Sequence, residues 1–76
     1  MKEFIEFIAK YLVDNPEGVL LEQEEKESKI IFKLKVAEND IGKVIGRKGR
    51  TAQAMRTLLS AIAAKEGKRV ILEILD

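Results

Sequence analysis

Cysteine and histidine are both missing from this chain of 76 residues. Their absence excludes disulfide bonds, thiolate chemistry and nearly every zinc, copper or haem site. Serine and threonine hydroxyls also lack the histidine that most often activates them as nucleophiles. We therefore expect no cofactor, no bound metal and no catalytic residue.

Long apolar runs are missing as well. No stretch approaches the roughly 20 apolar residues that cross a bilayer, and the opening segment Met1–Glu6 carries acids where a signal peptide needs a basic lead. The sequence predicts a cytoplasmic protein that does not insert into membranes. Its length predicts one domain, residues 1–76, which buries only about 60% of the surface of its unfolded chain and therefore has a thin core.

The spacing of apolar residues predicts six elements. Helical spacing marks the first segment, the Asp14–Gly18 turn with its single proline ends it, and a cap from Asn39 or Asp40 opens the second helix. The predicted helices span residues 2–14, 41–45 and 50–65, and the predicted strands span 19–25, 30–36 and 69–75, with residues 26–29 linking the first two strands as a hairpin.

This order, αββααβ, predicts an α+β fold with a three-stranded mixed sheet. The last two strands are joined by a helical crossover, the connection that parallel pairing requires. All helices are then expected on one face of the sheet. The other face stays partly bare and carries Ile31, Ile71 and Leu75.

The net charge of +1 conceals an uneven distribution. Residues 1–28 carry eight acids against three lysines, whereas residues 41–65 carry six lysines and arginines and no acid. A basic segment on a nearly neutral protein is typical of a polyanion site, and an ordinary solvated surface is the simpler alternative.

The motif Gly46-Arg47-Lys48-Gly49 lies inside this basic segment, between the short helix and the long one. Glycines permit a tight helix-to-helix turn and a close approach of a sugar-phosphate chain to the backbone. The amino end of the long helix favours an anion at the same place. An isolated GxxG usually does no more than turn the chain, so its position and its cations carry the prediction of a phosphate site.

Residues 30–75, with Ile41–Arg50 at their centre, resemble the KH domain. The extra helix and strand ahead of the motif resemble the type II, bacterial arrangement. The segments Asp14–Glu17, Gly49–Ala52 and Met55–Thr57 resemble the small stand-alone bacterial KH proteins of the KhpA family.

The resemblance implies that about four nucleotides of single-stranded RNA lie in a groove, with their backbone clamped by the GxxG loop. Ile41, Val44, Ile45 and Ala52 would form its apolar floor, although many KH domains have a larger aliphatic residue at the position of Ala52. The implied RNA-binding residues are Ile41, Lys43, Val44, Ile45, Gly46, Arg47, Lys48, Gly49, Arg50, Ala52 and Arg56. Lys33 and Lys35 are further candidates at the exit of the strand. For both of them, a solvated strand face is the favoured interpretation.

No aromatic residue lies near the loop, so stacking platforms are not expected, and binding by one copy should be weak and dependent on salt. The resemblance implies an RNA chaperone or post-transcriptional regulator that forms a homodimer or pairs with a second KH protein. The alternative is a protein-interaction module that uses the fold as a dimerisation platform. The long helix supports some partner through its apolar residues Leu58, Leu59, Ala61, Ile62, Ala63 and Ala64.

Overall fold

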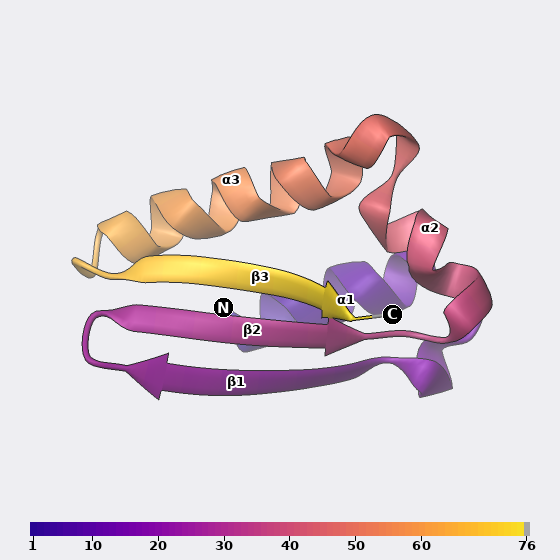
Figure 1. Cartoon of the computed structure of the whole chain (residues 1–76), viewed down its shortest axis with the longest axis horizontal. Helices are drawn as coiled ribbons and strands as arrows, with labels where there is room; N and C mark the ends of the chain where they lie inside the picture. Colours follow the sequence, from indigo (N-terminus) through magenta and orange to yellow (C-terminus); the bar gives the residue numbers. More distant parts are fainter. Residues whose placement is uncertain (76) are drawn as a thin grey trace.

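The strand β2 (Lys29–Lys35) lies at the centre of a three-stranded sheet in this computed structural model, which describes residues 1–75 (Figure 1). β1 (Leu20–Lys26) pairs with it antiparallel, and β3 (Arg69–Leu75) pairs with it parallel on the other side. The mixed sheet predicted from the helical crossover is thus confirmed. Residue 76 of the expected domain lies outside the described residues.

Alternation along β2 decides where the core lies. Ile30, Phe32 and Leu34 are at most 2% exposed, and they share one face of the sheet because side chains alternate along a strand. Helices α1 (Lys2–Leu12) and α3 (Arg50–Ala64) lie on that face (Figure 1). The prediction that the helices share one side of the sheet, as in a KH-type α+β fold, is confirmed.

The opposite face of the sheet is open to solvent over the described residues. Ile31 and Ile71 are register partners on this face, as the sequence predicted, and Ile71 remains 36% exposed. None of the helices within residues 1–75 is both long and apolar enough to cross a membrane.

Helix α1 ends two residues earlier than predicted. Val13 is already extended, although its N–H still donates to the carbonyl of Ala9 at 3.2 Å. Beyond it, the N–H groups of Asp14 and Asn15 donate to the side chain of Asp40 instead of to helix carbonyls. A short 3-10 turn, Pro16–Gly18, then leads into β1.

The hairpin is tighter than predicted. Lys26 pairs with Lys29, so the expected four-residue link shrinks to the two-residue turn Glu27-Ser28, with Glu27 in a left-handed conformation at φ 44°. The buried pair Leu21 and Leu34 sets this register. α3 ends within one residue of its predicted end, Gly67 follows it at φ 70°, and β3 has its predicted bounds.

The short helix α2 (Ile41–Ile45) begins without a side-chain cap, so the expectation of a cap from Asn39 or Asp40 is wrong. A 3-10 turn, Glu38–Asp40, runs directly into α2, and the N–H of Ile41 donates to the carbonyl of Glu38. Asp40 occupies the N-cap position, but its carboxylate points to the end of α1 instead.

The carboxylate of Asp40 joins the end of α1 to the start of α2. It is 1% exposed, and its two oxygens accept the N–H groups of Asp14 at 3.2 Å and Asn15 at 3.0 Å. Lys43 Nζ lies 3.6 Å from Oδ1. Burial opposes ionisation, but the two backbone hydrogen bonds and Lys43 outweigh it, so the pKa of Asp40 lies below its ordinary value.

We expect Asp40→Asn to lower the midpoint of thermal unfolding by about 5–10 °C, because one of two buried N–H groups then faces an amide that cannot accept its hydrogen bond. Asp14→Asn is the matched control, since it neutralises an exposed carboxylate that contacts the same lysine. It should change the midpoint by less than about 3 °C.

The effect of Asp40→Asn should also depend on pH. A lowered pKa means that the stabilisation is complete above the ordinary aspartate pKa of about 4 and is lost as the pH falls through the lower pKa of the folded state. The difference between wild type and variant should therefore be largest near pH 7 and shrink below pH 4 in unfolding measured by circular dichroism. An equal difference at all pH values would contradict an ionised Asp40.

Candidate functional site

The loop Gly46–Gly49 changes the direction of the chain between α2 and α3 through left-handed backbone conformations. Gly46, Lys48 and Gly49 have φ values of 79°, 56° and 73°. Arg47–Gly49 forms a 3-10 turn, in which the N–H of Gly49 donates to the carbonyl of Gly46 at 3.0 Å. Glycine adopts these angles without strain, but Lys48 does so at a cost of about 1–2 kcal/mol. Strain of this kind is concentrated at binding sites.

The two glycines of the loop have different structural requirements. A Cβ on Gly46 would overlap the side chain of Thr51 and lie 2.8 Å from its backbone nitrogen, so only glycine lets the end of α2 pack against the start of α3. A Cβ on Gly49 would meet nothing within 4 Å, so φ alone constrains that position. Gly46 is therefore part of the packing of the loop, and Gly49 is part of its turn.

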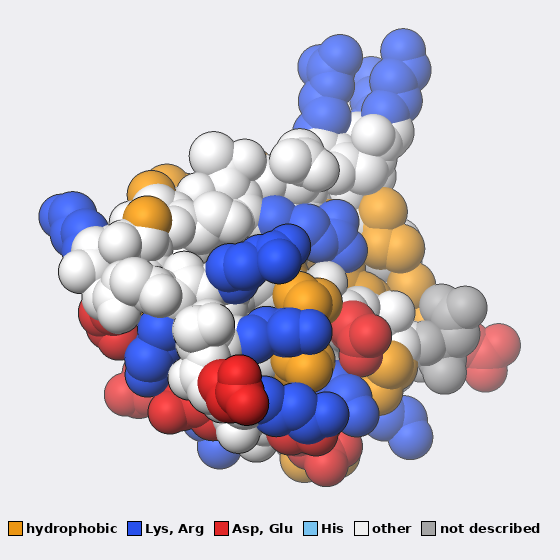
Figure 2. All heavy atoms as spheres, turned by 60° about the vertical axis from the view of Figure 1, so that its left-hand side comes forward, with side chains coloured by type: hydrophobic (Ala, Val, Ile, Leu, Met, Phe, Trp, Pro, Cys, Tyr) orange, Lys and Arg blue, Asp and Glu red, His pale blue; other side chains and the backbone are white. Residues whose placement is uncertain are grey.

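The electrostatics of the loop favour an anion. Arg47, Lys48 and Arg50 are exposed, and within residues 1–75 none of them forms an ion pair. No side chain caps the first turn of α3, and that turn contains no acid. The N–H of Arg50 donates to the carbonyl of Arg47, but the positive end of the helix dipole and three mobile cations coincide here. Figure 2 shows basic side chains projecting from the top of the molecule, where this loop lies.

The four residues expected to form an apolar floor separate into two pairs. Ile41 and Ile45 are partly exposed beside the loop. Val44 is fully buried and Ala52 is 3% exposed, so both contribute to the protein core behind that surface. Only Ile41 and Ile45 present apolar atoms to a ligand in this conformation.

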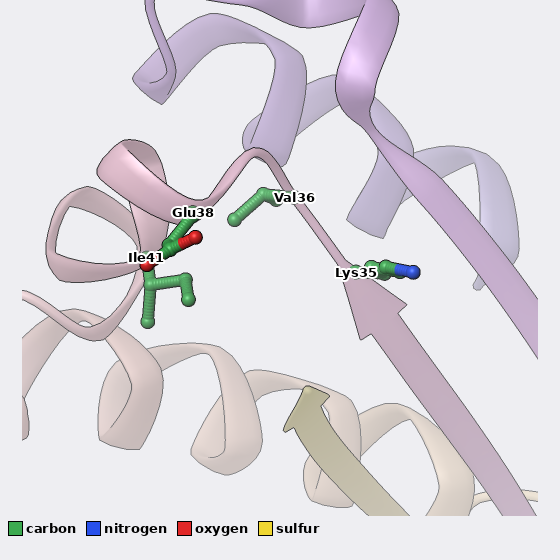
Figure 3. Close-up of a pocket in the computed structure, with 4 residues that line it drawn as sticks. All are labelled: Lys35, Val36, Glu38 and Ile41. Carbon is green, nitrogen blue, oxygen red and sulfur yellow. The ribbon is translucent and has the colours of Figure 1, made fainter. Parts of the chain in front are cut away.

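A shallow hollow of about 540 Å³ adjoins Ile41 at the end of β2. Val36 and Glu38 also line it, with Lys35 at its margin (Figure 3). It lies at the opposite end of α2 from the loop. An apolar and mixed-charge surface thus continues from the basic loop along α2.

Two predicted cationic contacts are engaged within the protein. Lys43 Nζ donates to Asp14 Oδ2 at 2.9 Å, and this hydrogen bond, together with the Asp14 charge, raises the pKa of Lys43. Arg56 donates from Nε and Nη2 to the carbonyl of Leu72, at 3.3 and 3.2 Å. Both side chains are still exposed at the surface, but each also holds elements of the fold together.

The Arg56 contact identifies the free edge of the sheet. The N–H of Arg69 donates to the carbonyl of Ser28 at 2.8 Å, so the backbone groups of Arg69 face β2. Because backbone direction alternates along a strand, the other odd-numbered residues of β3 also face β2. Leu72 therefore directs its backbone groups outward, next to α3. β3 is an edge strand of this sheet, so among the described residues its outward backbone groups have no partner strand, and the carbonyl of Leu72 accepts from Arg56 instead.

Gly42 is an exposed residue of this surface that sequence reasoning did not name. It lies within α2, where its backbone is helical and a Cβ would meet nothing within 4 Å. Glycine costs a helix about 1 kcal/mol relative to alanine, and nothing in the fold requires it here. The signal in the sequence was a glycine placed inside the helix predicted at residues 41–45. Among residues 1–75, no three acidic side chains gather closely enough to hold a metal ion.

Comparison with known proteins agrees with this arrangement. Residues 2–74 match the model of the KhpA/KhpB KH domain. A protein named RNA-binding protein KhpA from Caldanaerobacter subterraneus is 55% identical over 75 residues, which are 99% of this chain and 100% of that relative. The protein of the same name from Clostridium perfringens is 52% identical, again over 99% of this chain and 100% of that relative. The one from Aquifex aeolicus is 47% identical over 100% of this chain and 96% of that relative. The whole described fold and nearly the whole sequence thus place this chain in the KhpA/KhpB family of KH-domain proteins.

Proposed function

We propose that this chain binds single-stranded RNA, without catalysis, through the loop Gly46–Gly49 and the adjacent surface of α2, and that residues 1–76 act as one KH unit. The observation that carries the proposal is the loop itself. Its glycines are held in left-handed conformations, its cations form no ion pair within residues 1–75, and it leads into the start of α3, which has no side-chain cap. The printed names of the relatives, RNA-binding proteins, support the same ligand.

The loop holds the sugar-phosphate backbone. Arg47 and Lys48 neutralise phosphates, and the positive end of the α3 dipole attracts phosphate oxygens. Gly42 leaves the surface of α2 without a side chain, so the backbone of the ligand passes close to the helix. Because phosphates are common to all sequences, these contacts fix the position of the RNA and carry no base preference.

The bases are directed away from the phosphates, toward Ile41, Ile45 and the free edge of β3. Apart from the carbonyl of Leu72, which accepts from Arg56, the outward N–H and C=O groups of this edge match the hydrogen-bonding edges of unstacked bases. About four nucleotides cover such a surface. With two partly exposed isoleucines and no aromatic residue for stacking, one copy binds weakly.

A second copy or a second KH-domain protein compensates for this weakness through avidity. In that arrangement the protein acts in the cytoplasm as an RNA chaperone or post-transcriptional regulator.

Homodimerisation has a specific observation in its favour. Leu58 and Ile62 lie one turn apart on α3 and are 52% and 40% exposed, whereas Leu59 and Ala63 of the same helix are fully buried. The exposed pair forms an apolar stripe that a partner helix would cover.

We expect the double variant Arg47→Asp/Lys48→Asp to weaken binding to unstructured RNA at least ~10-fold, about 1.4 kcal/mol, because two phosphate contacts become repulsive. A gel-shift assay at low salt measures the change, and circular dichroism checks that the fold is intact. Lys2→Asp/Lys10→Asp, with the same change of net charge on α1, is the control and should bind within ~2-fold of wild type. Unchanged binding by the loop variant would falsify the RNA clamp.

Gly42 allows a test in which stability and binding change in opposite directions. Gly42→Ala and Gly42→Leu should each raise the free energy of unfolding by about 0.5–1 kcal/mol, since both residues favour the helix more than glycine does. Affinity for RNA should fall with the size of the new side chain, slightly for alanine and ~10-fold or more for leucine. A leucine variant that binds as tightly as wild type would remove Gly42 from the site.

The dimer is tested by Ile62→Asp, which places a charge in the apolar stripe and should convert a two-chain mass to a one-chain mass in analytical ultracentrifugation. Ser60→Asp is the control, because it adds the same charge at an exposed position of α3 outside the stripe. A wild-type protein that sediments as one chain at high concentration would contradict the dimer.

A further inference from the structure

Three cations lie side by side on the open face of the sheet, at its hairpin end. Lys26 is the register partner of Lys29, and Lys29 is the register partner of Arg69, so the row crosses all three strands. Lys29 lies on the open face because its neighbour Ile30 is buried on the helix side. Register partners share a face, and neighbouring strands are about 4.8 Å apart, so the three side chains leave the sheet within about 10 Å of one another. We call these three residues the cation row.

A second row on the same face shows the opposite arrangement. Glu22 is the register partner of Lys33, which is the register partner of Glu73, so the charges alternate across the three strands. Alternation is favourable, whereas like charges directly opposite one another destabilise a sheet. The same strands therefore place charges favourably at one position and unfavourably at the cation row.

Little within the protein relieves this repulsion. All three side chains of the cation row are exposed. Lys26 Nζ lies 3.4 Å from Glu24, but among residues 1–75 neither Lys29 nor Arg69 forms an ion pair. Two unpaired cations, with a third beside them, form a surface that gains from an anionic ligand carrying closely spaced charges.

The cation row lies far from the loop Gly46–Gly49. The loop precedes α3, and the cation row includes the first residue of the strand that follows it. The 15 residues of α3 span about 22 Å, and Figure 1 shows the loop and the hairpin at opposite ends of the molecule. In Figure 2, basic side chains lie over the lower body of the molecule as well as on the projecting loop.

We propose that Lys26, Lys29 and Arg69 form a second phosphate-binding site for the same RNA strand, which the loop grips at the other end of the domain. This inference rests on the proposed function. A single strand rises about 3.4 Å per stacked nucleotide and also passes from the helix side of the sheet to its open face, so at least about seven nucleotides bridge the two sites. The second site then adds affinity only for RNA strands longer than about 10 nucleotides. It makes binding depend on the length of the strand and not on its base sequence.

The test compares Lys29→Glu/Arg69→Glu with Lys2→Glu/Lys10→Glu, which changes the net charge equally on α1. Fluorescence anisotropy measures affinity for oligouridines of 4 and 15 nucleotides at several salt concentrations. We expect the row variant to bind the 15-mer at least ~5-fold more weakly than the control and to bind the 4-mer equally well. The slope of log affinity against log salt for the 15-mer should shrink by about 1.4, the value for two lost phosphate contacts.

Thermal unfolding supplies an independent readout. Lys29→Glu converts the row to alternating charges, so this single variant should unfold at a higher temperature than wild type while binding the 15-mer more weakly. Lys29→Gln/Arg69→Gln, which introduces no acid, should show a smaller loss of affinity in the same direction.

Equal 15-mer affinities for the row variant and the control would overturn the second site and leave the cation row without a role in RNA binding. The loop variant Arg47→Asp/Lys48→Asp separates this failure from failure of the proposed function. If the loop variant binds both oligomers as tightly as wild type does, the proposed RNA binding by the loop is wrong. If it loses the 4-mer while the row variant matches its control, only the second site is wrong.

Discussion

The loop that carries the site depends on a buried ion at the other end of its helix. α2 is only five residues long, too short to hold its own orientation, and it enters the fold through Asp40. The carboxylate of Asp40 accepts two amides from the segment after α1 and is balanced by Lys43 from the next turn. A charge at this depth persists only because its hydrogen bonds are complete. These contacts thereby help to set the position of Gly46 relative to the sheet.

Local patterns predicted the element order because their physics is local. Alternation at Ile30, Phe32 and Leu34 predicted the second strand, and the helical crossover predicted a mixed sheet with its helices on one face. In the structure these three residues are buried on that face. The loop was also predictable, since glycine spacing and missing acids are properties of consecutive residues. The contacts that were missed join distant residues. Asp40 bonds to positions 26 and 25 residues away, and Arg56 reaches a carbonyl 16 residues away. Nothing in the spacing of single residues indicates such partners.

The site residues divide by what they do when no ligand is present. Lys43 and Arg56 hold segments of the fold together, and Val44 and Ala52 fill the core, whereas within residues 1–75 the side chains of Arg47 and Lys48 form no ion pair. A motif in the sequence cannot separate these groups, because both lie within the same short segment. The rigid members keep the loop in one shape, so that binding restricts chiefly the two mobile cations. Such preorganisation lowers the entropic cost of association for a protein with little surface to offer.

The uneven distribution of charge along the chain becomes an uneven distribution in space. The acidic residues 1–28 fold into α1 and the edge strand β1, while the acid-free segment forms α2, the loop and α3. In Figure 2, the projecting top of the molecule carries basic side chains, whereas acidic and basic side chains are mixed over its lower part. The protein is therefore an electric dipole despite its net charge of +1. A dipole in the field of a polyanion turns its positive end toward it, so electrostatic steering favours encounters in which the loop faces a polyanion and the acidic side is turned away.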